Sequence, residues 1–316
     1  MKTRIIATIL VVLIAEACFA VGADAGDSYK SVLSRTVELA GDRSQEIQHF
    51  QMESRLIHYA LDGTRVSTDV YKLRLKCVPA KLSSKAGDEY TCLDFTLKIG
   101  NAPEVSIPVL KGWSYIFNMT PTNLDGAGQV LGIDHAKFVN LKDAKGNAIP
   151  QANAYHVYNA FIDFHSFCNV FAERTAGGKG IQNLKKIGEK IVHASAFSEP
   201  PVDVGSNVAK GSFFKNGEIT LEFKGLSLVD DAPCAIVTVD SGQSSFKMLM
   251  NPKTNMELRA VGSSHYKGDI YIDLATKWVR KVAFYELVIT ESNMPATQKK
   301  ANEVVERNIT IRNIKE

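Results

Sequence analysis

Apolar and polar residues alternate along most of this chain, and the alternation predicts a protein built mainly of β-strands. Two long alternating segments, residues 45–61 and 64–77, meet at Asp62-Gly63, a dipeptide that suits a tight hairpin turn because both positions tolerate positive φ. Shorter strands are expected at residues 90–99, 104–110 and 112–119. From residue 210 onward strand follows strand with turn signals between them, which is typical of an antiparallel meander.

The middle of the chain has helical periodicity instead. Residues 154–174 carry an apolar stripe within an arc of about 80° on a helical wheel, formed by Val157, Phe161, Phe164, Cys168 and Phe171. Residues 181–195 have a narrower stripe beside a side rich in lysine. Such a basic helix can lie on an anionic membrane, but this one lacks Trp and Phe, which favours a packed helix with a solvated outer face. A short helix is also expected near residues 134–141.

These segments predict a mainly β (α+β) fold, a curved antiparallel sheet or half-barrel with a two-helix insert in the middle of the chain. We expect an N-terminal β lobe at residues 26–150, a helical insert at residues 151–196 and a C-terminal meander at residues 197–316. The two β parts form either separate lobes or one continuous sheet, and the pattern leaves both open.

The last long strand before the C-terminus is apolar on both faces. Val282, Phe284 and Val288 share one face, and the opposite face carries Ala283, Tyr285, Leu287 and Ile289. An antiparallel strand of this kind must be covered twice. The core of the sheet supplies one cover, and the helical insert or an apolar ligand would supply the other.

The N-terminus has the layout of a secretory signal peptide at residues 1–25. Lys2 and Arg4 precede the apolar run "IIATILVVLIA", and small residues offer cleavage after Ala20, Ala23 or Ala25. An alternative is a lipid anchor at Cys18, although Ala15 and Glu16 depart from the usual lipoprotein signal. We therefore expect an exported protein, periplasmic or extracellular. No later apolar run approaches the roughly 20 residues that a bilayer span needs, so no transmembrane segment is expected in the mature chain.

Composition and charge exclude one class of partner. The chain is 45% hydrophobic and 22% charged, which is typical of a globular protein. Its 37 lysines and arginines barely outnumber 34 acidic residues and are spread evenly. A nucleic-acid partner is therefore not expected.

Export changes what the cysteines can do, because an oxidising compartment permits disulfides. Cys77 ends one expected strand and Cys92 begins the next, so their proximity in sequence makes them the candidate disulfide. Strict alternation opposes the pair, because it places Cys92 on the face opposite Leu93, Phe95 and Leu97. A bulge would reconcile the two, so the pair stays open. No CxxC motif is present, and structural zinc is not expected.

Four chemically capable side chains lie within the first helical segment: His156, Asp163, His165 and Cys168. On the wheel Cys168 lies in the middle of the apolar stripe, whereas His156 and Asp163 point the other way. Only His165 and Cys168, three residues apart, could share a ligand. We interpret Cys168 as a buried packing residue and expect no metal, cofactor or catalytic residue here.

Three other motifs have structural interpretations. "GSSH" at residues 262–265 places neighbouring side chains on opposite faces of a strand and lacks a nucleophile-elbow pattern. Asp230-Asp231 precedes Pro233 in an expected turn, where paired acids usually cap backbone groups. "GGKG" at residues 177–180 lacks the spacing and the trailing Ser or Thr of a phosphate-binding loop.

Three C-terminal motifs carry a family resemblance: "SEPPVDVGSNVAKGS", "VDDAPCAIVTV" and "YKGDIYIDLATKWVRKVAF". Over about residues 197–290 the chain resembles uncharacterised secreted bacterial β-rich proteins, and these motifs mark hairpins rather than chemistry. In architecture the expected fold is similar to LolA/LolB-type lipoprotein carriers, and this resemblance implies a curved half-barrel around an apolar cavity.

Two functions of different classes follow. In the first, a non-enzymatic envelope protein binds an apolar ligand or a lipidated partner between its sheet and the aromatic helix, with Tyr158, Phe161, Phe164 and Phe284 as the ligand-binding residues. In the second, the core is full, and the protein is an exported structural or interaction protein without a small-molecule ligand. An enclosed apolar cavity of several hundred Å³ would favour the first function.

Overall fold

The computed structural model describes residues 35–120, 129–173, 179–200, 208–251, 254 and 257–314. The expected signal peptide at residues 1–25, with Cys18, lies outside this part of the chain. In the described ranges, no helix is long and apolar enough to cross a bilayer.

The N-terminal half forms the expected hairpin and three further strands. Its long strands are β1 (Gln48–Tyr59), β2 (Arg65–Val78) and β3 (Glu89–Lys98). A one-turn helix α2 (Ala80–Ser83) joins the second and third, and two short strands follow, β4 (Val105–Ser106) and β5 (Ser114–Ile116). These two are much shorter than the strands expected at residues 104–110 and 112–119, and Pro108–Leu110 form a 3-10 turn instead. A small separate hairpin consists of β6 (Gln129–Val130) and β7 (Ile133–Asp134), and the short helix expected nearby is a 3-10 turn (His135–Phe138).

The C-terminal half is the expected antiparallel meander. Its strands are β8 (Lys190–Val192), β9 (Phe213–Lys215), β10 (Thr220–Val229), β11 (Ala232–Asp240), β12 (Ser244–Met250), β13 (Leu258–Asp273), β14 (Val279–Met294) and β15 (Lys299–Ile314). Residues 258–273 form one strand of 16 residues.

The two β parts are one sheet. The last strand, β15, pairs with β1 along its whole length, from His49 opposite Ile314 to Tyr59 opposite Val304. The resulting 13-stranded sheet is not closed, and ten of its strands follow the order β4-β3-β2-β1-β15-β14-β13-β11-β10-β8. The other three lie off this path: β5 pairs with β3, and β12 pairs with β13 and β9. The expected N-terminal lobe and C-terminal meander are therefore joined at the middle of a continuous antiparallel sheet.

Both edges of the sheet end in short strands. β4 has two residues and β8 has three, so neither offers a long open ladder. β10 extends past β8, and there the register shifts between Phe223 and Gly225, which makes Lys224 the extra residue of a bulge. Short edge strands, bulges and edge lysines are the devices that prevent strands of other molecules from adding to a sheet.

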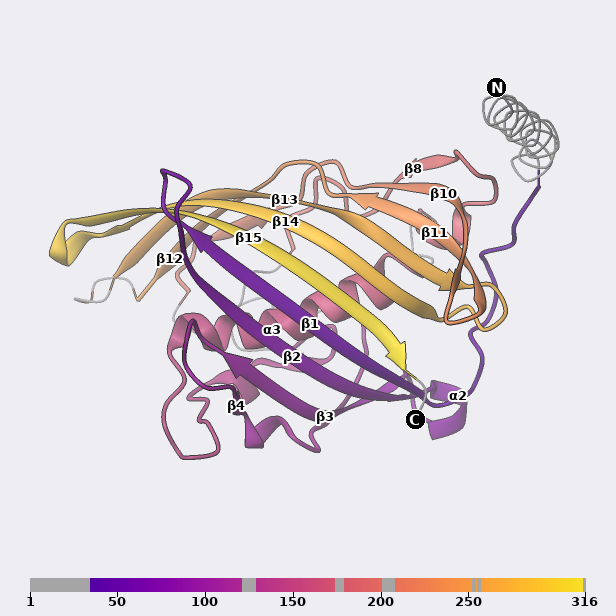
Figure 1. Ribbon diagram of the computed structural model, residues 1–316, viewed down its shortest axis with the longest axis horizontal. Helices are drawn as coiled ribbons and strands as arrows, with labels where there is room; N and C mark the ends of the chain where they lie inside the picture. The colour runs from indigo at the N-terminus through magenta and orange to yellow at the C-terminus, as the bar shows by residue number, and fades with distance from the viewer. Residues whose placement is uncertain are drawn as a thin grey trace, which may run out of the picture.

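The long helix α3 (Gln151–His165) begins after Pro150 and lies against one face of the curved sheet, whose strands pass in front of it in Figure 1. Its last turns continue as a π-helix (Ser166–Val170), in which the Phe171 amide donates to the Ser166 carbonyl (3.0 Å). The face of the sheet toward α3 is called the inner face below, and the opposite face is the outer face. The apolar stripe predicted for residues 154–174 is buried on the inner face.

The second predicted helix is wrong. Residues 181–183 form a single 3-10 turn, and residues 190–192 form strand β8, which pairs with β10. Gly188, between them, has a φ of 87°, which a right-handed helix does not allow. The alternation of Ile191 with its polar neighbours fits an edge strand as well as a narrow helical stripe, and pairing with β10 decides between them.

Phe161→Ala should lower the free energy of unfolding by about 3 to 5 kcal/mol, because the Phe161 side chain is fully buried and its removal leaves a cavity. Urea unfolding of both proteins measures the difference. Leu228→Ala is the control, because Leu228 is 68% exposed and its loss should change stability by less than about 0.5 kcal/mol. A Phe161→Ala variant as stable as the parent would contradict this packing.

Candidate functional site

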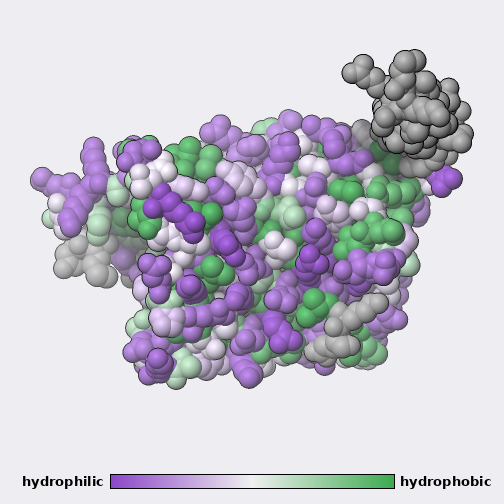
Figure 2. All heavy atoms as spheres, in the orientation of Figure 1, coloured by the Kyte–Doolittle hydropathy of each residue, from purple (hydrophilic) through white to green (hydrophobic). Residues whose placement is uncertain are grey.

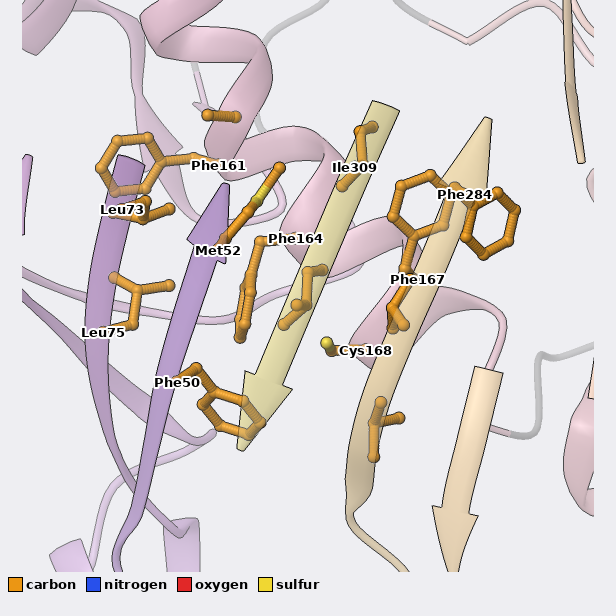
Figure 3. Close-up of a cluster of buried hydrophobic side chains, with 14 of the residues drawn as sticks. Phe50, Met52, Leu73, Leu75, Phe161, Phe164, Phe167, Cys168, Phe284 and Ile309 are labelled. Carbon is orange, nitrogen blue, oxygen red and sulfur yellow. The ribbon is translucent and has the colours of Figure 1, made fainter. Parts of the chain in front are cut away.

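The four residues predicted to bind an apolar ligand are core residues in two separate places. Phe161 and Phe164 are 0% exposed, and Tyr158 and Phe284 are 4% exposed. Figure 3 shows Phe161 over β2 beside Leu73, whereas Phe284 lies on β14 next to Phe167. The structure therefore does not bring Tyr158 and Phe161 together with Phe284 around one space.

Neighbouring rings occupy the space around each of these side chains. The ring of Phe161 contacts those of Phe95, Trp113, Tyr115 and Phe138, with centroids 5.5 to 6.2 Å apart. Phe164 contacts Phe50 (5.1 Å) and Tyr90 (5.7 Å), and Phe284 stacks on Phe167 (4.1 Å). Tyr158 contacts Phe138, and its hydroxyl bonds to His135 Nε2 (2.9 Å). These contacts are those of a packed aromatic core.

Two hollows on the surface are lined by other residues. One, of about 370 Å³, lies beside the end of the π-helix and is lined by charged groups and the edge of Trp278. The second, of about 440 Å³, lies on the outer face over β10, β11 and β13 and is lined by lysines, carboxylates and threonines. Neither is the apolar cavity that the carrier hypothesis needs.

The four candidate ligands on α3 do not converge, as the wheel predicts. His156 lies against Tyr71 (5.7 Å between ring centroids), and burial lowers its pKa to about 4. Cys168 is 2% exposed, and burial raises the pKa of its thiol far above the usual range. Among the described residues, no group of three or more His, Cys, Asp or Glu side chains is placed to hold a metal ion.

His165 is held as a neutral core residue by a chain of hydrogen bonds that begins at Arg43. Arg43 Nη1 donates to Asn169 Oδ1 (3.0 Å), which fixes the orientation of that amide. Asn169 Nδ2 must then donate to His165 Nδ1 (2.7 Å), so Nε2 carries the proton and donates to the Tyr115 hydroxyl (2.8 Å). Burial lowers the pKa of His165 to about 3. The imidazole is therefore a structural link and not an acid or base.

Arg43 closes the helix end beside the first hollow. Its Nη2 donates to the carbonyl of Cys168 (2.9 Å), and its guanidinium lies over the Trp278 ring (4.5 Å to the centroid). Nη1 also pairs with Glu173 (2.8 Å), with Asp88 at 3.7 Å. A cation at a helix C-terminus complements the helix dipole. Because protein groups already neutralise Arg43, the floor of the hollow has no unpaired charge to attract an anion.

A second cluster joins α3 to the middle of the sheet through a buried ion triad. Arg307 on β15 pairs with Asp163 of α3 (2.5 Å from Nη1 to Oδ2) and, through Nε, with Glu286 of β14 (2.6 Å). The three side chains are 7 to 15% exposed. Burial raises the pKa of Asp163 to about 6 against the opposing effect of Arg307. Burial also disfavours the charge on Arg307, but the two carboxylates together keep its pKa above the usual value.

A third cluster holds the end of β1. His58 Nδ1 bonds to Glu303 Oε1 of β15 (2.5 Å), and Nε2 lies 3.6 Å from Asp69 Oδ2 of β2. The carboxylates of Asp69 and Glu303 raise the pKa of His58 to about 9, although burial lowers it. Asp69 also accepts the backbone amide of Gly100 (2.9 Å). The protonated imidazole thus connects three strands.

None of these clusters was predicted, although the strands carry a signal for one of them. Glu286 lies between Phe284 and Val288 on the inner face, and Arg307 lies between Val305 and Ile309. A charge at an inward position of an alternating strand is itself a signal, because burial requires a partner of opposite sign. Two opposite charges at inward positions of adjacent strands therefore predict an ion pair between them.

The four cysteines of the described chain are free buried thiols. A bulge does reconcile the faces, because Arg74 pairs with Asp94 and Leu75 with Cys92, which makes Leu93 the extra residue. Cys77 nevertheless lies opposite Tyr90, so Cys77 and Cys92 are diagonal neighbours. Diagonal Cα atoms are roughly 7–8 Å apart, beyond the usual 4.4–6.8 Å of a disulfide. The structure therefore does not form the Cys77–Cys92 disulfide.

The other motifs have structural roles. Ser264 is buried on the inner face, whereas His265 points outward and bonds to Asp240 (2.7 Å between Nε2 and Oδ1). Asp230 and Asp231 both have positive φ and form the two-residue turn between β10 and β11. Of the "GGKG" segment, Gly177 and Gly178 lie outside the described residues.

The outer face of β14 remains without a cover in the described chain. Val261, Tyr285 and Ile289 are 44 to 49% exposed, and Val66, in a bulge opposite Tyr59, is 68% exposed. The register places Tyr59, Val304 and Ile289 in one cross-strand row and Ile57, Glu306 and Leu287 in the next. We call the apolar residues of this region the outer patch: Ile57, Tyr59, Val66, Val261, Tyr285, Leu287, Ile289 and Val304.

The outer patch is interrupted and surrounded by polar groups. Glu306 lies within it and accepts hydrogen bonds from the Tyr59 hydroxyl (3.2 Å) and Asn308 Nδ2 (2.9 Å). Figure 2, in the orientation in which the sheet lies in front of α3, shows apolar areas among hydrophilic side chains. Exposed apolar residues gathered on one face and rimmed by polar groups are a feature of protein-binding sites.

No protein-family model matches this chain, and a search of curated proteins finds no match. The resemblances to secreted bacterial β-rich proteins and to LolA/LolB-type carriers therefore stay predictions.

Arg307→Met should destabilise the protein by about 3 to 5 kcal/mol, because Asp163 and Glu286 would remain buried without their cation. The triple variant Asp163→Asn, Glu286→Gln, Arg307→Met removes all three charges and should recover most of that loss. Urea unfolding at neutral pH compares the three proteins. A triple variant as unstable as Arg307→Met would show that the cost comes from packing and not from unpaired charge.

Stability should fall as the pH rises through about 9, because the pKa of His58 is raised in the folded protein from 6.5 to about 9. The contribution of His58 is fully present below pH 6.5, where the residue is protonated in both states, and is lost as the folded form releases its proton. His58→Gln is the matched control. The difference in unfolding free energy between the parent and His58→Gln should shrink between pH 6 and pH 10, and a constant difference would contradict the assignment.

Proposed function

We propose that this is an exported, non-enzymatic interaction protein with a filled core, which binds a protein partner through the outer patch. The observation that carries the proposal is the uncovered apolar face of β14, a strand whose inner face is already covered by α3 and its π-helix. A strand that is apolar on both faces needs a second cover. Packing of the aromatic rings beneath α3 favours an external cover over an enclosed ligand.

Charge and chemistry at the other sites support a binding role rather than catalysis. His165 and His156 have lowered pKa values and lie among aromatic rings, and the hydrogen bonds of His165 are with protein groups. The ion triad of Asp163, Arg307 and Glu286 is satisfied internally. These described groups thus hold the sheet or the helix in place.

The carrier function remains the alternative, and thermal melts distinguish the two. With a filled core, the melting temperature of the parent should not change when fatty acid or detergent monomer is added, because a ligand stabilises only a state that binds it. The Phe161→Ala variant should melt lower and gain no dependence on these ligands. A concentration-dependent rise in the melting temperature of the parent would favour a carrier.

The partner contact can be tested directly with a photo-crosslinking amino acid at position 289, in the protein expressed in its own host. We expect a covalent adduct with a protein. The same amino acid at Leu228, which is exposed on the β10–β11 hairpin away from the outer patch, is the control. Equal labelling at both positions, or none at position 289, would contradict a binding role for the outer patch.

A further inference from the structure

We propose that the partner of the outer patch is a second copy of this chain, packed face to face about a two-fold axis. This inference rests on the proposed function and adds the identity of the partner. The arrangement of charge around the outer patch carries it, because the rim is complementary to itself.

The rim carries a lysine at one end and a glutamate at the other. At one end Lys267 of β13 is paired by the register with Tyr285. At the other end Glu291 of β14 is paired with Val261. Between them lie the Leu287 row and the Ile289 row, which are the apolar centre of the outer patch.

Consider a two-fold axis that runs parallel to these rows and passes midway between Leu287 and Ile289. It brings the Lys267 end of each copy onto the Glu291 end of the other. Leu287 of each copy then faces Ile289 of the other, and Ile57 faces Tyr59. Glu291 of each copy faces Tyr285 of the other and lies beside its Lys267. Lys267 has room for this contact, because its nearest carboxylate, Asp240, is 3.6 Å away and the lysine is 61% exposed.

Glu306, the one charge inside the outer patch, does not oppose this packing. Its two carboxylate oxygens already accept hydrogen bonds from Tyr59 and Asn308 within the same chain. A carboxylate that keeps its partners costs less to cover than a free one. Isologous contacts of this kind, in which the same surface serves both copies, are the commonest way in which proteins form dimers.

Charge also argues for a protein partner over a lipid surface. Anionic membranes attract faces whose polar residues are mainly Lys and Arg. The rim here mixes Lys267 and Arg55 with Glu291, and Glu306 adds a negative charge inside the outer patch. The mixed rim therefore favours another protein surface that carries charges of both signs.

The size of the outer patch predicts a weak dimer. The patch crosses five strands, which are four intervals of about 4.8 Å, and four rows, which are three intervals of about 6.8 Å. The area is therefore roughly 400 Å² per copy. Interfaces that bury less than about 1,200 Å² in total are weak or transient. We therefore expect a weak, reversible dimer that forms at high local concentration.

Sedimentation equilibrium of the purified chain over a dilution series, from the highest concentration at which it stays in solution downward, tests the proposal. The average mass should rise toward twice the monomer mass. Ile289→Glu should abolish the rise, whereas Leu228→Glu, an equally drastic change at an exposed site elsewhere, should leave it unchanged. Circular dichroism of each variant shows that the fold is intact. A chain that stays monomeric throughout, or one whose dimer ignores Ile289→Glu, would overturn the inference.

A charge exchange tests the two-fold geometry itself. Glu291→Lys should weaken the dimer about tenfold, because it places two lysines together, and Lys267→Glu in the same chain should restore it. Failure of the second change to rescue the first would overturn this packing.

The photo-crosslink at position 289 separates this inference from the proposed function. An adduct of twice the chain mass supports the second copy. An adduct with a different protein, from a chain that is monomeric in solution, would overturn the second copy and leave the proposed function standing. Binding of the parent, but not of Ile289→Glu, to vesicles of anionic phospholipid would overturn both.

Discussion

The pairing of β1 with β15 is the interaction on which the rest of the structure depends. His49 lies opposite Ile314, so the central ladder joins residues from the two ends of the described chain. Without that ladder the strands would form two smaller sheets, and each would cover only part of α3. The inner face that receives Phe161, Phe164 and Phe167 exists because both halves contribute to it. Contacts between such distant residues are slow to form, so we expect the centre of the sheet to assemble late in folding.

Local pattern was enough to predict the long strands and the long helix. The β1–β2 hairpin follows Asp62-Gly63, and α3 follows the stripe that includes Phe161 and Phe164. Pattern failed at residues 181–195, where the same apolar spacing is compatible with two structures. Gly188 at positive φ and the hydrogen-bonding needs of the edge of β10 determine the outcome, and neither is a local property of that segment.

The polar clusters could be predicted only in part, because their partners are distant in sequence. Asp163 and Arg307 are 144 residues apart, and Arg43 and Asn169 are 126 apart. The inward positions of Glu286 and Arg307 were readable from the alternation of their strands, but Arg43 belongs to an irregular leader without any period. The aromatic residues of α3 were correctly expected on the apolar side. Whether aromatic rings or a ligand would fill the space beside Phe161 could not be predicted. It depends on Phe95, Trp113 and Phe138, which belong to other elements.

The short edge strands limit how molecules of this kind can assemble. In the described residues, the sheet ends in the short strands β4 and β8 and has a bulge at Lys224, which leaves little open edge to which further molecules could add. Contact through the face of a sheet, in contrast, buries the binding surface of both molecules, so no further molecule can bind there. Growth into fibres is therefore disfavoured even where the chain is concentrated, and a protein with so much β-structure can remain in small, finite assemblies.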